Sequence, residues 1–186
     1  QCTYGVMCNS GTSALQVALQ TLKIKHSWED GDEVILPATT FVATANIVIH
    51  NRMTPIFVDV EADHYGINTQ LIEEKISKRT RCIIPVHLFG MPCQMDQVMK
   101  IARQYDLKVI EDSAETMFAK FDNQVVGSIG DIGCFSTYVA HILTTGVGGL
   151  ITTSNAEYAK TIRSLINHGR DTKYISIDDG KGKTPE

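Results

Sequence analysis

A hydroxyl-rich turn near the start of the chain could hold an anion. Gly11, Thr12 and Ser13 stand between a predicted strand and a predicted helix. Glycine lets the backbone come close to a ligand, and the amides of a helix's first turn, together with hydroxyl groups, attract a phosphate. The same residues also suit an ordinary helix cap. The motif alone leaves both interpretations open.

Acidic and aromatic side chains follow two further predicted strands. Asp112 and Glu115 come after a strand expected over residues 108–111, and Phe41 follows a strand expected over residues 33–36. A carboxylate held against a pyridine-type nitrogen keeps that nitrogen protonated, so the ring can withdraw electrons. An aromatic side chain can lie flat on a planar ligand. The alternatives are a solvated acidic turn and, for Phe41, packing in the core.

A glycine-dense segment over residues 127–149 contains a serine and a histidine that could take part in chemistry. Glycines at this density indicate tight turns and a backbone close to a ligand. Ser136 could bind an anion, and His141 could act as a base near neutral pH. The alternative is a hairpin-rich edge in which the histidine is incidental.

Helix-like and strand-like patterns alternate along the chain. We expect strands over residues 6–8, 33–36, 54–60, 82–86, 108–111, 131–136 and 149–153, and helices over residues 10–22, 40–49, 69–76, 95–105 and 156–166. This alternation is typical of an α/β fold with a mainly parallel sheet. In such sheets ligands bind beyond the carboxyl ends of the strands, which is where the candidate residues stand.

The composition is that of a globular protein and does not favour nucleic acid or a membrane as a partner. Of 186 residues, 43% are hydrophobic and 20% charged, with a net charge of −4. The basic residues form no stripe and the apolar stretches are only strand-sized. The five cysteines have no C-x-x-C spacing, which indicates free thiols in a reducing cytoplasm and no metal site.

The two ends of the sequence suggest a piece of a longer polypeptide. The chain begins at Gln1 and enters the hydroxyl-rich turn almost at once, and it stops shortly after a polar run at residues 178–183. We therefore expect residues 1–186 to be an incomplete domain.

Four further motifs, taken with these turns, resemble the DegT/DnrJ/EryC1/StrS family of sugar aminotransferases and sugar 3-dehydratases. They are residues 31–35 (Gly-Asp-Glu-Val-Ile), 55–60 (Pro-Ile-Phe-Val-Asp-Val), 85–90 (Pro-Val-His-Leu-Phe-Gly) and 167–169 (Asn-His-Gly). The resemblance covers nearly the whole chain. It implies a fold-type I architecture, a three-layer α/β/α sandwich with a mainly parallel seven-stranded sheet. The chain would be the cofactor-binding large domain without its C-terminal small domain, and the protein would be a homodimer.

The resemblance also implies roles for individual residues around pyridoxal 5′-phosphate or pyridoxamine 5′-phosphate. Thr12 and Ser13, beside Gly11 and helped by Ser136, would hold the cofactor's phosphate. Phe41 would stack on the pyridine ring. Asp112 would pair with the ring nitrogen, and Glu115 would lie near the phenolic oxygen, as in relatives that resemble perosamine synthases.

Two positions depart from the family pattern. The family's lysine lies five residues after the serine that matches Ser136, and this sequence has His141 there. Imidazole has no primary amine and cannot condense with the cofactor's aldehyde as lysine does. The related 3-dehydratases carry histidine in a Tyr-x-Ala-His run, which residues 138–141 match. Val147 stands where the family usually has glutamate.

Three functions are compatible with these residues. The first is a 3-dehydratase acting on a 4-keto-6-deoxy sugar linked to a nucleoside diphosphate, with His141 as the base. The second is the family's usual aminotransferase, with glutamate as amino donor. The third is a non-catalytic binding or regulatory protein of the same fold. An iron–sulfur cluster, present in some related dehydratases, would be encoded outside this chain.

Overall fold

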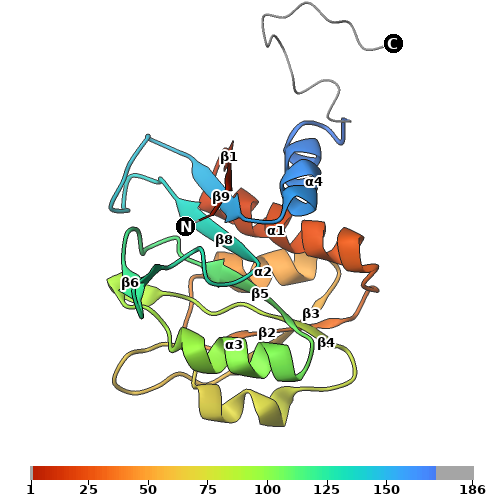
Figure 1. Ribbon diagram of the computed structural model, residues 1–186, viewed down its shortest axis with the longest axis vertical. Coiled ribbons are helices and arrows are strands. Elements are labelled where there is room, and N and C mark those ends of the chain that lie inside the picture. The colour runs from red at the N-terminus through yellow and green to blue at the C-terminus, as the bar shows by residue number, and fades with distance from the viewer. Residues whose placement is uncertain (1, 171–186) are drawn as a thin grey trace, which may run out of the picture.

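A seven-stranded sheet forms the centre of the molecule, as the computed structural model shows for residues 2–170 (Figure 1). The polar run at residues 178–183 lies outside the described residues. The strands, in their order across the sheet, are β1 (Tyr4–Cys8), β9 (Gly149–Thr153), β8 (Ile132–Ser136), β5 (Lys108–Asp112), β4 (Thr80–Ile83), β2 (Glu33–Pro37) and β3 (Thr54–Val58). Strand β9 is antiparallel to both neighbours, and the other pairs are parallel. Six strands therefore point the same way, which confirms the predicted mainly parallel sheet.

Helices cover both faces of this sheet. The helices are α1 (Gly11–His26), α2 (Val42–His50), α3 (Met95–Gln104) and α4 (Ala156–Ile166). Alternate residues of the central strands enter two separate cores: Val34 and Leu36 pack with α1, α2 and α4, whereas Ile35 between them packs with α3. This period of two is what a strand buried on both faces requires. The predicted three-layer α/β/α sandwich is confirmed.

Local sequence signals account for the ends of the longest helix. The Ser10 hydroxyl caps α1 by accepting the backbone N–H of Ser13, and Ser27 ends the helix in the left-handed conformation. Between these ends, small and branched apolar residues recur every three or four positions and are buried, as expected for a helix that packs along a sheet. This packing fixes the first turn of α1 at the end of β1.

The structure corrects the prediction of a helix over residues 69–76. This segment forms two short 3₁₀ turns, η1 (Thr69–Leu71) and η2 (Glu73–Lys75), with Asn68 capping the first as expected. A helix of eight residues has few internal hydrogen bonds, so packing decides its form. Here Ile72 is fully buried, and the chain becomes extended at Ile76 before it enters β4.

Two other details differ from the sequence-based expectation. The strand predicted over residues 82–86 ends at Ile83, and only Val86 forms a further bridge, to Asp112. A small hairpin that we did not expect joins β6 (Lys120–Phe121) to β7 (Gln124–Val125). Its turn residues, Asp122 and Asn123, both have positive φ, the conformation of a tight type I′ hairpin turn. Within residues 2–170, no helix is both long enough and apolar enough to cross a bilayer.

Candidate active site

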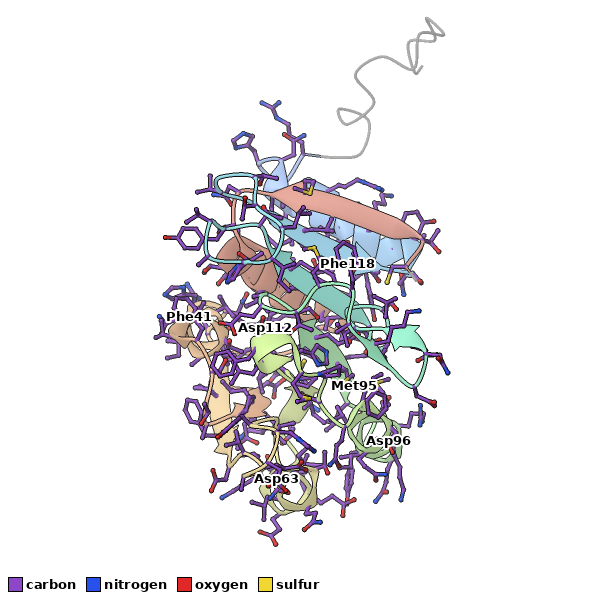
Figure 2. All side chains as sticks on the ribbon, turned by 90° about the vertical axis from the view of Figure 1, so that its left-hand side faces the viewer. Phe41, Asp63, Met95, Asp96, Asp112 and Phe118 are labelled. Carbon is purple, nitrogen blue, oxygen red and sulfur yellow. The ribbon has the colours of Figure 1, made fainter. Side chains whose placement is uncertain are left out.

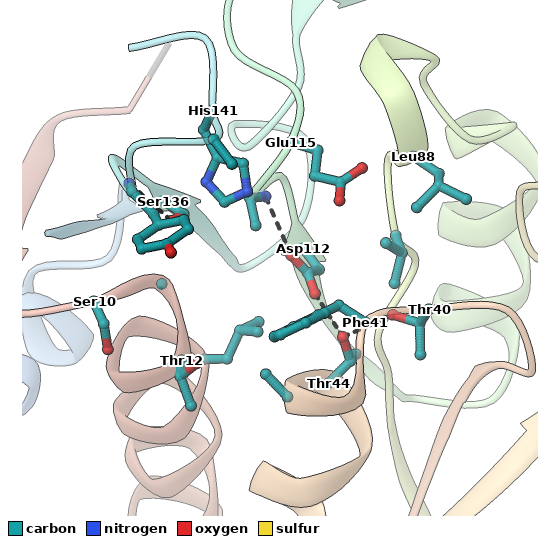
Figure 3. A pocket seen from close by; sticks show the side chains of 17 residues that line it. Ser10, Thr12, Thr40, Phe41, Thr44, Leu88, Asp112, Glu115, Ser136 and His141 are labelled. Atoms are coloured by element: carbon teal, nitrogen blue, oxygen red, sulfur yellow. Dashed lines mark hydrogen bonds between the residues drawn. The ribbon is translucent and has the colours of Figure 1, made fainter. Parts of the chain in front are cut away.

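A cavity of about 420 Å³ opens at the carboxyl edge of the sheet, the edge at which open α/β sheets bind ligands. Seven of the eight predicted site residues line it: Gly11, Thr12, Phe41, Asp112, Glu115, Ser136 and His141 (Figure 3). In Figure 2, Phe41 and Asp112 lie at about mid-height, Phe41 at the left margin of the molecule, whereas Asp63 and Asp96 lie toward its lower end. The fold thus brings residues from five separate segments of the chain to one place.

The turn before α1 forms one wall of the cavity and could hold an anion. A Cβ added to Gly11 would come within 2.7 Å of the Cβ of Ser136, so only glycine lets α1 approach the end of β8 so closely. Thr12 and Ser136 both line the cavity, and the positive end of the α1 dipole lies beside them. Ser13 is placed differently: its amide and hydroxyl both bond to Ser10, and it is not among the lining residues.

The Asp112 carboxylate lies on the opposite wall and is almost completely buried, with 4% of its surface exposed. Its Oδ2 accepts the Thr44 hydroxyl at 2.8 Å, and its Oδ1 accepts the Ala114 amide at 3.2 Å. Burial raises the pKa of Asp112, and these two hydrogen bonds lower it in part. In the described part of the chain, Asp112 forms no ion pair with a lysine, arginine or histidine. The carboxylate therefore offers its charge to the cavity.

Phe41 stands at the mouth of the cavity, with 67% of its surface exposed. It occupies the cap position of α2, where its side chain makes no capping hydrogen bond. A large apolar side chain with this exposure is not part of the core, so the alternative of core packing does not describe it. Its ring is available to a planar ligand.

Glu115 lines the same cavity and holds a neighbouring turn. Its Oε2 accepts the Phe89 amide at 3.3 Å, in the short turn η3 (Leu88–Gly90) where Phe89 has a positive φ of 53°. The Thr116 hydroxyl adds a second tie, because it donates to His87 O and accepts the Gly90 amide. The turn that carries Leu88 into the cavity wall is thereby fixed to the segment that follows β5.

His141 lies on the cavity wall in the loop between β8 and β9. Its backbone amide donates to Tyr138 O at 2.9 Å, and the two rings meet edge to face with their centres 6.1 Å apart. The imidazole Nδ1 is buried and has no hydrogen-bond partner among the described residues. Buried polar atoms without a partner are uncommon, so this nitrogen is an exception among the described side chains that line the cavity.

A buried network behind the cavity was not predicted. Glu111 is fully buried and accepts the amides of Gly127, Ile129 and Gly130, each at 2.7 Å. It also lies 3.1 Å from Nε2 of His87, whose Nδ1 accepts the Cys93 amide. Nδ1 is therefore the acceptor nitrogen and Nε2 the donor. The signal available in the sequence was a glutamate at the end of an otherwise apolar run, which indicates a charge with fixed partners.

Several lining residues were also missed, namely Ser10, Thr40, Thr44 and Tyr138. Thr40 and Thr44 sit one helical turn apart at the start of α2, with their hydroxyl oxygens 2.8 Å apart. Threonines are common at helix starts, so only their approach to Asp112, which the fold determines, distinguishes them.

Comparison with known proteins agrees with this arrangement. The model of the DegT/DnrJ/EryC1/StrS aminotransferase family matches residues 1–180. The chain is 46% identical over 167 residues to a UDP-N-acetyl-3-dehydro-α-D-glucosamine 3-aminotransferase of Acidithiobacillus ferrooxidans, covering 89% of this chain and 44% of that protein. It is 40% identical over 168 residues to a GDP-perosamine synthase of Caulobacter vibrioides, covering 90% and 44%.

A solved structure has the same fold. The E. coli GDP-4-keto-6-deoxy-D-mannose-3-dehydratase with bound hydrated PLP superimposes with a TM-score of 0.89 at 28% identity, over 100% of this chain and 48% of that one. The chain spans less than half the length of the curated relatives it matches. The match to the family model extends from the turn before α1 through all the segments that line the cavity, and the chain belongs to the DegT/DnrJ/EryC1/StrS aminotransferase family.

Proposed function

We propose that this protein binds pyridoxal phosphate or pyridoxamine phosphate in the cavity and removes the C3 hydroxyl of a nucleotide-linked 4-keto-6-deoxy sugar. One observation carries the proposal: His141, which occupies the family's lysine position, lines the cavity, and its buried Nδ1 has no hydrogen-bond partner among the described residues. No lysine of the described residues lines the cavity. An enzyme so arranged would hold its cofactor without a covalent bond.

The residues present fit such a cofactor. At one end of the cavity, Thr12 and Ser136 lie beside the N-terminus of α1, which suits a phosphate. On the other wall, the Asp112 carboxylate has no cationic partner among the residues described. A protonated ring nitrogen would supply the missing charge. The exposed ring of Phe41 could cover a flat ligand held between these two groups.

Within this site each side chain would have a distinct task. The cofactor, when bound, supplies a ring that accepts electrons from the bond being broken. Asp112 would keep a proton on the ring nitrogen, which maintains that capacity. Phe41 would restrict the ring to one plane and keep water from one of its faces. Glu115 would face the ring's phenolic oxygen from the wall that it shares with Asp112.

His141 would move the proton on which dehydration depends. An imidazole ordinarily exchanges protons near neutral pH, and a base so placed typically contributes about 10²- to 10⁴-fold to a rate. Tyr138 packs edge to face against the imidazole and would restrict its rotation. Since imidazole cannot form the covalent link that lysine forms, His141 would serve proton transfer alone.

A second candidate is transfer of an amino group from glutamate to a keto sugar. It is favoured by the names of the relatives from Acidithiobacillus ferrooxidans and Caulobacter vibrioides, at 46% and 40% identity. His141 could pass the proton in this reaction as well. Glutamate would be the amino donor for either activity, because both need the cofactor in its amino form.

We also propose that a second copy of the chain covers the cavity mouth in a cytoplasmic homodimer. Large apolar side chains surround the cavity and are mostly exposed, among them Phe41, Phe89, Val139 and Ile142. Exposed apolar patches of this kind mark interfaces. All five cysteines are free thiols, which suits a reducing compartment.

The experiment that decides between the two activities uses the full-length protein with pyridoxamine phosphate, glutamate and a set of nucleotide-linked 4-keto sugars. We expect the wild-type protein to release its cofactor on dialysis and to form a product without the 3-hydroxyl. His141→Asn should bind the cofactor but lose about 10²- to 10⁴-fold in dehydration, because an amide cannot accept the proton. His141→Lys, given pyridoxal phosphate in place of pyridoxamine phosphate, should condense with the aldehyde and release water, and borohydride should make this bond permanent, visible as an increase in protein mass.

The outcomes separate the alternatives. An amino sugar that retains its 3-hydroxyl would identify the aminotransferase. Dehydration by His141→Asn at the wild-type rate would exclude His141 as the base. A full-length wild-type protein that binds neither form of the cofactor would favour a non-catalytic role.

A further inference from the structure

Thr44 makes the closest side-chain contact to the Asp112 carboxylate. It is fully buried in the first turns of α2, and its hydroxyl lies 2.8 Å from Oδ2 of Asp112. The same hydroxyl lies 2.8 Å from that of Thr40. Figure 3 shows the Thr44 hydroxyl between Asp112 and Thr40, close to Phe41.

The direction of these hydrogen bonds follows from the number of protons. An ionised carboxylate only accepts, so the single hydroxyl proton of Thr44 points to Asp112, and the Thr40 hydroxyl then donates to Thr44. Each bond polarises the next in such a chain. The row therefore delivers a strengthened donor to Oδ2 and favours the charged form of Asp112, against the burial that disfavours it.

Both carboxylate oxygens are held, and from different elements. Oδ2 is held by Thr44 of α2, whereas Oδ1 is held by the Ala114 amide beyond β5. Two donors on two oxygens fix the plane of the carboxylate as well as its position. Asp112 lines the cavity, and the lone pairs that these donors leave unused could accept a ring N–H of a ligand.

The same contact sets the spacing between two functional groups. Phe41 stands between Thr40 and Thr44 in the sequence, at the start of α2. The hydrogen bond from Thr44 to Asp112 therefore links the start of α2, which carries the aromatic ring, to the end of β5, which carries the carboxylate. A ring lying under Phe41 and pairing with Asp112 needs both at one fixed separation. Catalytic groups displaced by about 1 Å can lose about 10²-fold in rate.

We infer that Thr44 is a positioning residue, which keeps the Asp112 carboxylate ionised and aimed at a protonated ring nitrogen in the cavity. The inference rests on the proposed cofactor. It assigns to Thr44 a specific effect on ligands that carry that nitrogen, and none on ligands that lack it.

The test uses three variants of the full-length protein. Thr44→Val removes the hydroxyl and keeps the shape, and Thr44→Ser restores the hydroxyl. Thr21→Val is the matched control, because Thr21 is also a fully buried helical threonine, but its hydroxyl has no hydrogen-bond partner in the described part of the chain. Thermal unfolding of all three shows whether each is folded.

The first measurement is the affinity for pyridoxamine phosphate and for its 1-deaza analogue, in which C–H replaces the ring nitrogen. We expect Thr44→Val to lower the affinity for pyridoxamine phosphate about tenfold, the scale of one hydrogen bond to a charged group. The affinity for the deaza analogue should not change. Thr44→Ser and Thr21→Val should bind both ligands as the wild type does. Equal losses for the two ligands, or no loss for either, would overturn the inference.

The second measurement needs no cofactor. Carboxyl-carbon NMR of the ligand-free protein reports the pKa of Asp112, which we expect to rise by about one pH unit in Thr44→Val and not in Thr21→Val. The other titratable groups that act on Asp112 are His87, Glu115 and Cys134, and no variant alters them. An unchanged Asp112 titration would overturn the inference. If the wild type fails to bind pyridoxamine phosphate, the proposed function fails, and this titration still decides the role of Thr44.

Discussion

The two edges of the parallel sheet bury carboxylates in opposite ways. At the amino edge, Asp32 and Glu33 precede and begin β2 and are 5% and 6% exposed. Asp32 accepts Arg81 Nε at 2.9 Å, and Glu33 accepts Arg79, Ser77 and Thr80. At the carboxyl edge, Asp112 is equally buried but has a hydroxyl and an amide as partners.

The pKa values follow this difference. Burial alone would raise the pKa of Asp32 and of Glu33, but hydrogen bonds and charge from Arg81, Arg79 and their neighbours lower both below their ordinary values. Burial prevails at Asp112 and raises its pKa. Carboxylates at the amino edge are therefore satisfied by the protein and stabilise it. Asp112, in contrast both to these and to its neighbour Glu111, has neither a cation nor a set of amides around it among the described residues, at some expense in stability.

The largest effect is expected when the buried charge at the carboxyl edge is removed. In Asp112→Asn the ring nitrogen of the proposed cofactor would lose its proton, and turnover should fall by about two orders of magnitude or more. The unliganded variant should be at least as stable as the wild type, because a buried charge without a cation has been removed. Turnover assays and urea unfolding measure the two effects. Near-normal turnover would contradict the proposed role of Asp112 at the ring nitrogen.

The corresponding change at the amino edge should have the opposite result. Glu33→Gln leaves Arg79 without its carboxylate, and we expect a loss of about 1–3 kcal/mol in the free energy of unfolding. Turnover per folded molecule should stay at the wild-type level, because Glu33 lies at the far edge of the sheet from the cavity. Urea unfolding measures the free energy of unfolding, and an activity assay corrected for the folded fraction measures turnover per folded molecule. A catalytic defect without a stability defect would contradict the division between the edges.

The pH dependence of stability should also have opposite signs at the two edges. The folded pKa of Asp32 lies below its ordinary 3.8, so its stabilisation is present above that value and is lost as the pH falls through the folded pKa. The folded pKa of Asp112 lies above 3.8, so its burial destabilises the protein increasingly as the pH rises through the folded pKa.

Unfolding measured from pH 3 to pH 7 would reveal this directly. The free energy of unfolding of Asp112→Asn should exceed that of the wild type by an amount that grows as the pH rises. The free energy of unfolding of Asp32→Asn should fall short of the wild-type value by an amount that grows as the pH rises toward 3.8 and is constant above it. If the change in free energy of unfolding relative to the wild type followed the same course with pH in both variants, the two edges would not differ.

The smallest effect is expected at a buried polar group that serves neither edge. The Thr21 hydroxyl is buried in α1 without a partner among the described residues. Replacing it with the isosteric valine should stabilise the protein by about 0–1 kcal/mol, with no change in ligand binding. A marked destabilisation, seen as a lower midpoint of thermal unfolding, would mean that this hydroxyl has an undetected role.

The parts of the molecule that the sequence predicts correctly are those set by periodic patterns. The continuous apolar run of Val34, Ile35 and Leu36 identifies a strand buried on both faces, and similar runs recur in enough strands to determine the sheet. The short segment over residues 69–76 was wrongly predicted as a helix, because two turns contain too few hydrogen bonds to outweigh packing. The β6–β7 hairpin was missed, although its Asp-Asn turn is a recognisable signal.

The candidate site divides in the same way. Motifs bring Asp112, Ser136 and His141 to attention, and the structure places all three on one cavity. Their roles there stay predictions. The family resemblance assigns Ser13, with Thr12, to the cofactor phosphate, whereas in the structure its amide and hydroxyl bond to Ser10. Thr44 could not be found from sequence, because its meaning depends on a contact between segments 68 residues apart.

The reversed strand β9 has a consequence for the order in which the molecule can assemble. Strand β1 hydrogen-bonds to β9, although the two lie near opposite ends of the described chain. During synthesis β1 therefore emerges well before β9, its one neighbour in the sheet among the described residues, and such long-range pairing is slow. The turn at Gly11 also contacts Ser136 of β8, which emerges long after α1. This wall of the cavity should therefore be completed late, after β8 has joined the sheet.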